Sequence, residues 1–340
     1  MNNDKNDDAR IPSITVVCCI ESGSLEENTV RLVESLRRFG GIFQSIPIVA
    51  VTPRFGPPLS RRTLLVLDSL NARHVRFRAR NSYSWNGFLN KPLALAHIEQ
   101  SLTTESICWL DSDILVLNEP VLLALSQSED FLASISDFAN NGTNGAGAQE
   151  QYWRKVARIV GVDLASVPWV RTPLDSKRIR AYFNSGVFVY RRNTSFGQHF
   201  LKSCLDIFDA RIKSSADDVF FIDQVALGLT AARMGLRVRY LPLTYNFPIG
   251  SFIPERYISV AGMRDARLLH IHDAMYSPFW PTALDYLRQA QPQFADWIAE
   301  KGPIEVRNPL VWRAMGKALR VWRNRHRDRF SKEVGRPDDT

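Results

Sequence analysis

Two carboxylates that stand one residue apart, Asp111 and Asp113, carry the clearest chemical signal in the sequence. They follow an apolar run at residues 107–110, which is typical of a strand buried on both faces. Charge at the end of a buried strand is costly unless it is neutralised, and neighbouring carboxylates raise each other's pKa unless a cation lies near them. A divalent metal carrying an anionic ligand would satisfy both conditions. Two aspartates that end a strand and face water would give the same pattern.

The composition is that of an ordinary globular protein with a large core. The chain has 340 residues, of which 45% are hydrophobic, enough for one large domain or two smaller ones. No apolar run approaches the roughly 18 residues of a membrane-spanning helix. Residues 1–8 are polar and acidic, unlike a signal peptide. The four cysteines lack metal-ligand spacing, which predicts reduced core residues in a cytoplasmic protein: Cys18, Cys19, Cys108 and Cys204.

The positive charge of the chain lies near its C-terminus. Residues 306–332 contain nine Lys or Arg and one acidic residue, a surplus equal to the net charge of +8 of the whole chain. We therefore expect one domain over residues 11–302 and a basic amphipathic helix and tail over residues 303–340. This helix could dock on the domain, or lie on an anionic inner-membrane surface with Trp312 and Trp322 at the interface. Nucleic-acid binding is disfavoured, because no base-reading module accompanies the charge.

The first third of the chain alternates between strand and helix patterns. Strands are expected at residues 13–21, 46–52, 74–77 and 107–110, and helices at 25–39, 59–70 and 90–102. This rhythm predicts an α/β fold with a doubly wound sheet. Ligands of such sheets bind outside the carboxyl ends of the strands, where we expect both the aspartate pair and Glu21.

Further polar groups follow or interrupt later apolar runs. We expect a helix start at Asn118 and Pro120, and a strand at residues 131–136 followed by a Gly/Asn-rich loop at 140–148. A helix is expected at 149–160 and a strand at 237–241. Three further polar groups occupy notable positions: Asn184-Ser185-Gly186 just before an apolar strand, Asp223 and Gln224 where a helix opens, and His270 and His272 along a strand at 268–273. Asp223 could also be only a helix N-cap.

Five short motifs occur in an order that resembles the GT-A-fold nucleotide-sugar glycosyltransferases, most closely the family 8-like branch. They read WLDSD at 109–113, FNSGVF at 183–188, IDQVAL at 222–227, LPLTYN at 241–246 and LHIH at 269–272. The resemblance covers roughly residues 13–280. It implies a GT-A fold, an α/β structure with a mixed, mostly parallel sheet flanked by helices. It also implies transfer of a sugar from a nucleoside-diphosphate donor, expected to be a UDP-sugar, to a glycan or glycolipid hydroxyl.

The resemblance implies a role for each matching residue. Asp111, Asp113 and His270 would hold Mn²⁺ or Mg²⁺ against the donor diphosphate, with His272 an open alternative to His270. Such a cation stabilises charge on the leaving phosphate, and carboxylate oxygens with one imidazole suit Mn²⁺. The resemblance also implies Lys91 and Asp111 for donor binding, and Asn184, Asp223 and Gln224 for the reacting sugar and its acceptor. Glu21 lies outside the matched motifs and joins the donor-binding residues because of its place at the same sheet edge.

The late motif departs from the family pattern. Residues 273–280 read DAMYSPFW, so the family's lysine for the leaving phosphate is missing, and Lys91 or an arginine would have to replace it. Retention of the anomeric configuration is favoured by the resemblance, whereas inversion would need Asp223 as a base.

Two other functions are alternatives to a glycosyltransferase. One is a membrane- or nucleic-acid-binding adaptor on an inactive transferase scaffold, and the other is nucleotidyl- or phosphoryl-transfer chemistry.

Overall fold

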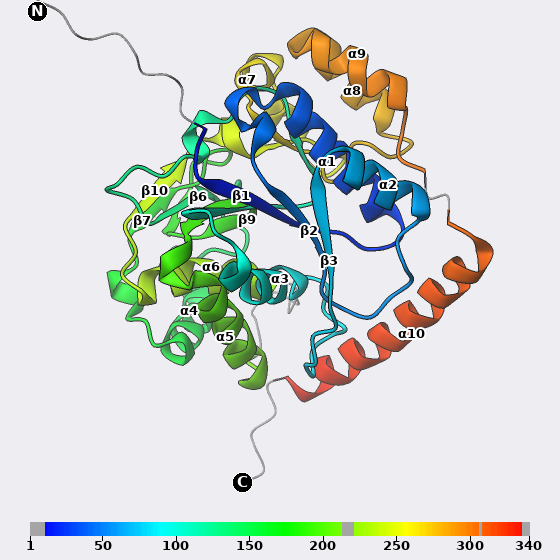
Figure 1. The fold of residues 1–340 in the computed structure, drawn as a ribbon. Coiled ribbons are helices and arrows are strands. Elements are labelled where there is room, and N and C mark those ends of the chain that lie inside the picture. The colour runs from blue at the N-terminus through cyan, green and yellow to red at the C-terminus, as the bar shows by residue number, and fades with distance from the viewer. Residues whose placement is uncertain (1–10, 213–220, 306–307, 335–340) are drawn as a thin grey trace, which may run out of the picture.

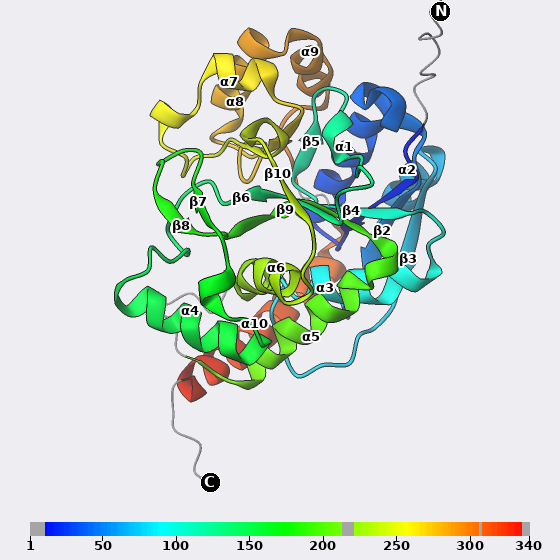
Figure 2. The same ribbon diagram turned by 90° about the vertical axis from the view of Figure 1, so that its left-hand side faces the viewer.

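The computed structural model describes residues 11–212, 221–305 and 308–334. Residues 1–8, which were expected to differ from a signal peptide, lie outside the described residues. So do residues 335–340, the last part of the predicted tail. Within the described chain, a seven-stranded sheet lies between two layers of helices (Figures 1 and 2). Its strand order is β10 (Val238–Leu241), β6 (Phe131–Ile135), β9 (Phe183–Arg191), β4 (Ser106–Leu110), β1 (Ile14–Cys19), β2 (Ile48–Thr52) and β3 (Ala72–Arg76).

The sheet is parallel except for β9. The pairs β1–β2, β1–β4, β2–β3 and β6–β10 are parallel, whereas β9 runs antiparallel to both of its neighbours, β4 and β6. The amino end of β9 therefore lies at the same edge of the sheet as the carboxyl ends of the other described strands. The predicted fold class, α/β with a mixed, mostly parallel sheet flanked by helices, is confirmed.

A second, three-stranded sheet adjoins this edge. It contains β5 (Ile114–Val116), β11 (Phe247–Pro248) and β12 (Leu268–His270), in the order β11–β12–β5. β12 runs antiparallel to β5, with His270 opposite Ile114. The turn at residues 111–113 connects β4 of the large sheet to β5 of the small one. The aspartate pair thus lies at the junction of the two sheets.

The central strands are buried on both faces, as their apolar runs predict. On β1, Val17 and Cys19 belong to one core and Val16 and Cys18 to another. Helices α3 (Asn90–Ile98), α4 (Gly147–Val160), α5 (Phe196–Asp209) and α6 (Ile222–Arg233) cover the first face, and α1 (Ser24–Phe39) and α2 (Arg61–Ser69) the second (Figure 2). The small sheet packs with α7 (Val260–Asp265), α8 (Trp280–Ala290) and α9 (Pro292–Lys301).

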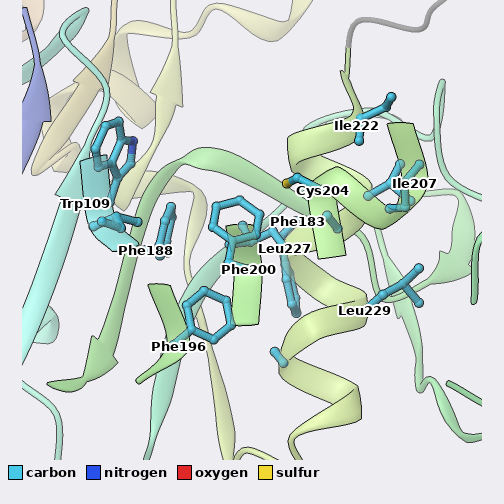
Figure 3. Close-up of a cluster of buried hydrophobic side chains, with 14 of the residues drawn as sticks. Trp109, Phe183, Phe188, Phe196, Phe200, Cys204, Ile207, Ile222, Leu227 and Leu229 are labelled. Atoms are coloured by element: carbon cyan, nitrogen blue, oxygen red, sulfur yellow. The ribbon is translucent and has the colours of Figure 1, made fainter. Parts of the chain in front are cut away.

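Aromatic side chains hold β9 in the centre of the sheet. The ring centroid of Phe188 lies 6.4 Å from that of Trp109, 6.3 Å from Phe196 and 6.2 Å from Phe200 (Figure 3). It also lies 5.9 Å from the ring centroid of Phe131. These rings come from β9, its two neighbouring strands and α5. The packing therefore fixes the strand on which the Asn184 motif lies.

The C-terminal helix α10 (Leu310–Glu333) packs against the domain mainly through one end. Phe330 is buried, with its ring centroid 5.3 Å from that of Trp85 and 5.6 Å from that of Phe208. Arg323 donates a hydrogen bond to the carbonyl oxygen of Phe55 (2.8 Å). Most of the remaining helix surface is exposed, and Leu310 is 77% exposed. Of the hypotheses for this segment, docking on the domain is the one that these contacts match.

The cysteines and the length of the helices bear on two expectations drawn from composition. All four cysteines are buried and unpaired. Among the helices of the described chain, none combines the length and apolar character needed to cross a bilayer.

Three local predictions were wrong. Asn118 and Pro120 start no α-helix: the chain makes a short 3₁₀ turn, Val121–Leu123, and then a turn closed by the Glu129 side chain on the backbone N–H of Ser126 (2.9 Å). The Asn184 motif lies inside β9, at an irregularity of its pairing with β6, and not before it. The strand at 268–273 ends at His270, because His272 turns into left-handed backbone with φ of 44°.

We expect Phe200→Ala to lower the free energy of unfolding by about 3–5 kcal/mol, because it empties a ring-sized space in a fully buried cluster. Urea denaturation followed by circular dichroism measures the change. Leu65→Ala, at a site that is 60% exposed, is the matched control and should change stability by less than about 0.5 kcal/mol. Equal effects of the two substitutions would contradict the assigned core.

Candidate active site

Most of the predicted site residues meet at the junction of the two sheets. Asp111 and Asp113 follow β4, and Asp223 lies in the first turn of α6. Lys91 lies in the first turn of α3, and Ser185 near the amino end of β9. β9 delivers Ser185 to this edge because it runs against its neighbours. Residues more than 130 positions apart in the sequence therefore form one polar cluster.

Lys91 is the cation of this cluster. Its ammonium lies 3.2 Å from a carboxylate oxygen of Asp111 and 3.2 Å from one of Asp223, and it donates to the hydroxyl of Ser185 (2.6 Å). Burial alone would lower the pKa of Lys91, but the two carboxylates raise it above its usual value. The lysine therefore stays charged and compensates two acidic groups that would otherwise be costly to bury.

Asp223 keeps one oxygen free within this cluster. Its Oδ2 accepts hydrogen bonds from Lys91 (3.2 Å) and Ser185 (2.8 Å). Its Oδ1 is buried and has no hydrogen-bond partner among the described residues. Phe221, and not Asp223, occupies the N-cap position of α6, so the interpretation of Asp223 as a simple cap does not hold. The neighbouring Gln224 accepts a hydrogen bond from the hydroxyl of Tyr182 (2.6 Å).

A second group of side chains lies on the other side of the aspartate pair. The ligand atoms of Asp113, His270 and His272 all lie within 4.8 Å of one another. His270 Nε2 is 3.4 Å from Asp113 Oδ2, and the two imidazole rings stack with centroids 3.8 Å apart. Burial would raise the pKa of Asp113, but the facing His270 lowers it to about 2, so the carboxylate is ionised. One carboxylate and two imidazoles form a donor set that suits Mn²⁺ or a similar divalent ion.

The surroundings orient these donors. Asn246 Oδ1 lies 3.0 Å from His270 Nδ1, which leaves Nε2 directed at Asp113. A Cβ atom on Gly186 would lie 2.8 Å from the His270 ring, so only glycine leaves room for this imidazole. His272 Nε2 is buried and lacks a hydrogen-bond partner within the part of the chain that the structure describes. An orphaned imidazole nitrogen beside a carboxylate and a second imidazole fits a bound metal.

Asp111 lies outside this three-residue group. Its carboxylate accepts a hydrogen bond from the Trp109 indole (2.7 Å) and faces Lys91. Asp111 and Asp113 thus point to different partners, one to the buried lysine and one to the histidines. The prediction that Asp111 also ligates the metal stays a prediction.

Asn184 and Asp137 form a neighbouring polar pair. Asn184 Oδ1 accepts a hydrogen bond from the backbone N–H of Gly186 (2.8 Å), and its Nδ2 lies 3.4 Å from Asp137 Oδ2. Burial raises the pKa of Asp137 to about 6, and its Oδ1 has no partner among the described residues. Asp137 was not among the predicted site residues, although it follows a predicted strand as Asp111 does. Unlike Asp111, it has no second carboxylate near it in the sequence to mark it.

Glu21 lies at the same edge but is already paired. Both of its oxygens bind the guanidinium of Arg54, and Asn90 donates a further hydrogen bond (2.8 Å). Burial would raise the pKa of Glu21, but Arg54 more than offsets this and lowers it. Asn90 precedes Lys91, so Glu21 is joined through α3 to the buried lysine. Its predicted role in donor binding stays a prediction.

Residues 16–235 match the family described as the Rhodobacterales glycosyltransferase domain. This match extends from β1 to the end of α6 and includes both Asp111 and Asp223. Among curated proteins, none matches the chain significantly.

Several solved glycosyltransferase structures are similar to the chain. The bifunctional glycosyltransferase WbbM shares 14% identity at a TM-score of 0.49, over 89% of this chain and 53% of WbbM. The glycosyltransferase GlyE of Streptococcus pneumoniae shares 14% at 0.48, over 86% of this chain and 65% of GlyE. The galactosyltransferase LgtC, in complex with donor and acceptor sugar analogs, shares 14% identity at a TM-score of 0.46, over 88% of this chain and 99% of LgtC. The chain thus spans less than two thirds of the first two proteins.

We expect His272→Ala to weaken Mn²⁺ binding at least about tenfold, because it removes one of three converging donors. Titration of free Mn²⁺ by electron paramagnetic resonance measures the affinity. His97→Ala, an exposed histidine on α3, is the control and should bind Mn²⁺ as the wild type does. Unchanged affinity in a folded His272→Ala protein would show that His272 is not a ligand.

Proposed function

We propose that the chain, which belongs to the Rhodobacterales glycosyltransferase domain family, transfers a sugar from a UDP-sugar to a hydroxyl group of a glycan or glycolipid. The transfer is proposed to need a divalent cation. The observation that carries the proposal is the pairing of two groups at one sheet edge. The ligand atoms of Asp113, His270 and His272 converge as a cation would need, and beside them Lys91 bridges Asp111 and Asp223. One group suits a metal, and the other suits the polar end of a donor.

The cation is proposed to be Mn²⁺, with Mg²⁺ possible, held by Asp113, His270 and His272 and with Asp111 facing the donor. Bound there, it would supply Lewis-acid stabilisation of the departing diphosphate. Ser112 fixes the turn between the two aspartates, since its hydroxyl donates to the carbonyl oxygen of Cys19 (2.5 Å). The two aspartates are therefore held on a rigid turn between the two sheets.

The sugar is proposed to lie beside Asp223, Gln224 and Asn184. The free Oδ1 of Asp223 is a buried acceptor for a sugar hydroxyl, while its Oδ2 is held by Lys91 and Ser185. A carboxylate held in an ion pair is better suited to orienting a sugar and stabilising positive charge on it than to removing a proton. This geometry supports retention of configuration, which the sequence motifs also favour.

Lys91 is proposed to be a positioning residue. Its ammonium already contacts oxygens of Asp111, Asp223 and Ser185. It holds the two carboxylates in place, and a different cation must meet the leaving phosphate.

The acceptor side is proposed to include the loop at residues 140–146 and the hairpin of β7 (Trp169–Arg171) and β8 (Arg178–Arg180). The guanidinium groups of Arg178 and Arg180 lie 4.6 and 4.1 Å from the ring centroid of Trp169. These guanidinium groups lie over the Trp169 ring and offer hydrogen-bond donors that suit the hydroxyls of a sugar. The exposed apolar residues Val311, Val321 and Trp322 of α10 would suit a glycolipid acceptor at the inner-membrane surface.

A panel of sugar nucleotides, assayed for Mn²⁺-dependent hydrolysis and transfer, tests this proposal. Asp111→Ala and Asp113→Ala should each lower turnover at least about a hundredfold, since each removes charge that organises the donor site. Asp285→Ala, whose side chain is 69% exposed, is the control and should retain wild-type turnover. Wild-type activity in either folded site variant would overturn the assignment.

Metal removal gives a separate test. A nucleoside diphosphate at a hundred times its Kd should stabilise the fold by about 2.7 kcal/mol when Mn²⁺ is present. Chelation with EDTA should abolish this stabilisation, because the cation is proposed to join protein and diphosphate. Thermal unfolding with UDP, with and without chelator, measures the effect. An inactive scaffold would show no stabilisation in either condition.

A further inference from the structure

A pocket of about 650 Å³ lies between α10 and the carboxyl ends of β1 and β2. The domain lines it with Glu21, Arg54 and Trp85, and α10 lines it with Trp312, Lys317 and Arg320. The α10 residues recur at helical spacing, so one face of the helix is turned toward the pocket. Figure 1 shows α10 along the outside of the domain, with its first turns on the side of α2 and its last turns on the side of α5.

The charges around this pocket are unbalanced. Besides Arg54, Lys317 and Arg320, the lining includes Arg313 and Arg323. Glu21 is the sole acid among the described lining residues, and Arg54 and Asn90 already occupy its oxygens. Cations gathered around a cavity repel one another unless an anion enters it. The charge of the lining therefore favours a negatively charged ligand over a neutral or cationic one.

Aromatic surface accompanies the charge. Trp85 and Trp312 both line the pocket. Trp85 also packs on Phe330, the buried anchor of α10, with ring centroids 5.3 Å apart. Aromatic side chains of this kind stack on nucleobases, while arginine and lysine bind phosphate. A ligand with a base at one end and phosphates at the other matches both features.

The pocket is connected to the candidate active site. Glu21 lines the pocket and accepts a hydrogen bond from Asn90 (2.8 Å). The next residue, Lys91, lies 3.2 Å from Asp111. The pocket and the aspartate pair therefore both adjoin the first turn of α3, on which Asn90 and Lys91 lie.

We propose that this pocket binds the nucleoside diphosphate of the donor, so that α10 forms a wall of the donor site with Lys317 and Arg320 as binding residues. The inference rests on the proposed function, and it assigns a role to the C-terminal helix that docking alone does not. It also gives the chain cations for the phosphates in place of the absent late lysine.

Calorimetric titration of the full chain with UDP in the presence of Mn²⁺ tests whether the cations of α10 contribute to binding. Lys317→Ala combined with Arg320→Ala should weaken binding at least about tenfold and reduce its salt dependence, because two charged contacts are lost. Arg323 is kept, since it holds α10 to Phe55. The control is Arg325→Ala combined with Arg329→Ala, which removes equal charge from α10 outside the pocket and should leave the affinity unchanged.

A steric test keeps every charge in place. Gly316 lines the pocket, and a Cβ atom there would meet nothing within 4 Å. Gly316→Phe should fill the pocket and weaken UDP binding, whereas Gly316→Ala should bind UDP as the wild type does. Both substitutions raise helix propensity, so loss of α10 does not explain a difference between them.

Four outcomes would overturn the inference. Wild-type affinity in both the double Lys317/Arg320 variant and Gly316→Phe would exclude α10 from the donor site while leaving the proposed function standing. Equal losses in the pocket variant and its control would indicate a general charge effect. Equal affinity for pyrophosphate alone would remove the nucleoside from the assignment. A wild-type chain that binds no nucleoside diphosphate in Mn²⁺ would instead overturn the proposed function, and this inference with it.

Discussion

The buried ammonium of Lys91 is the interaction on which the candidate site depends. Asp223 is 2% exposed, and an unpaired charge at that depth would cost several kcal/mol. Lys91 offsets this cost and also faces Asp111 and Ser185, so one cation joins α3, α6, β9 and the turn after β4. The elements must pack in one arrangement for these contacts to form together. Electrostatic compensation thus fixes the spacing of the groups that are proposed to meet the donor.

Strand direction explains how these groups meet. β9 runs against its neighbours, which brings Asn184 and Ser185 to the edge where Asp111 lies. The pairing of β12 with β5 likewise sets His270 opposite Ile114, next to Asp113. The same turn, residues 111–113, therefore has the large sheet's polar groups on one side and the small sheet's histidines on the other. The small sheet could therefore hold a metal while the large sheet holds a sugar beside it.

Local pattern was enough to predict part of this site, and chain topology supplied the rest. The buried run before Asp111 and the helix start at Lys91 depend on neighbouring residues, and both were predicted. The Asn246–His270 contact and the Lys91–Asp223 pair depend on strand order, which periodicity does not encode. His272 leaves the strand in left-handed backbone, with φ of 44°, and the apolar pattern of residues 268–273 did not indicate this turn. Asp137 carried the same strand-end signal as Asp111, but a single carboxylate is too common to single out.

The distribution of charge connects these observations to the C-terminal helix. The domain's site is rich in carboxylates, and the chain's net charge of +8 equals the surplus in residues 306–332. A nucleoside diphosphate with its cation needs both kinds of surface, acidic side chains for the metal and basic ones for the phosphates. Membrane or nucleic-acid binding alone would not require α10 to turn cations toward the sheet edge, yet Lys317 and Arg320 line a pocket there with Arg54. A helix that places four of its cations around one pocket is better explained by a ligand bound there than by an outside partner alone.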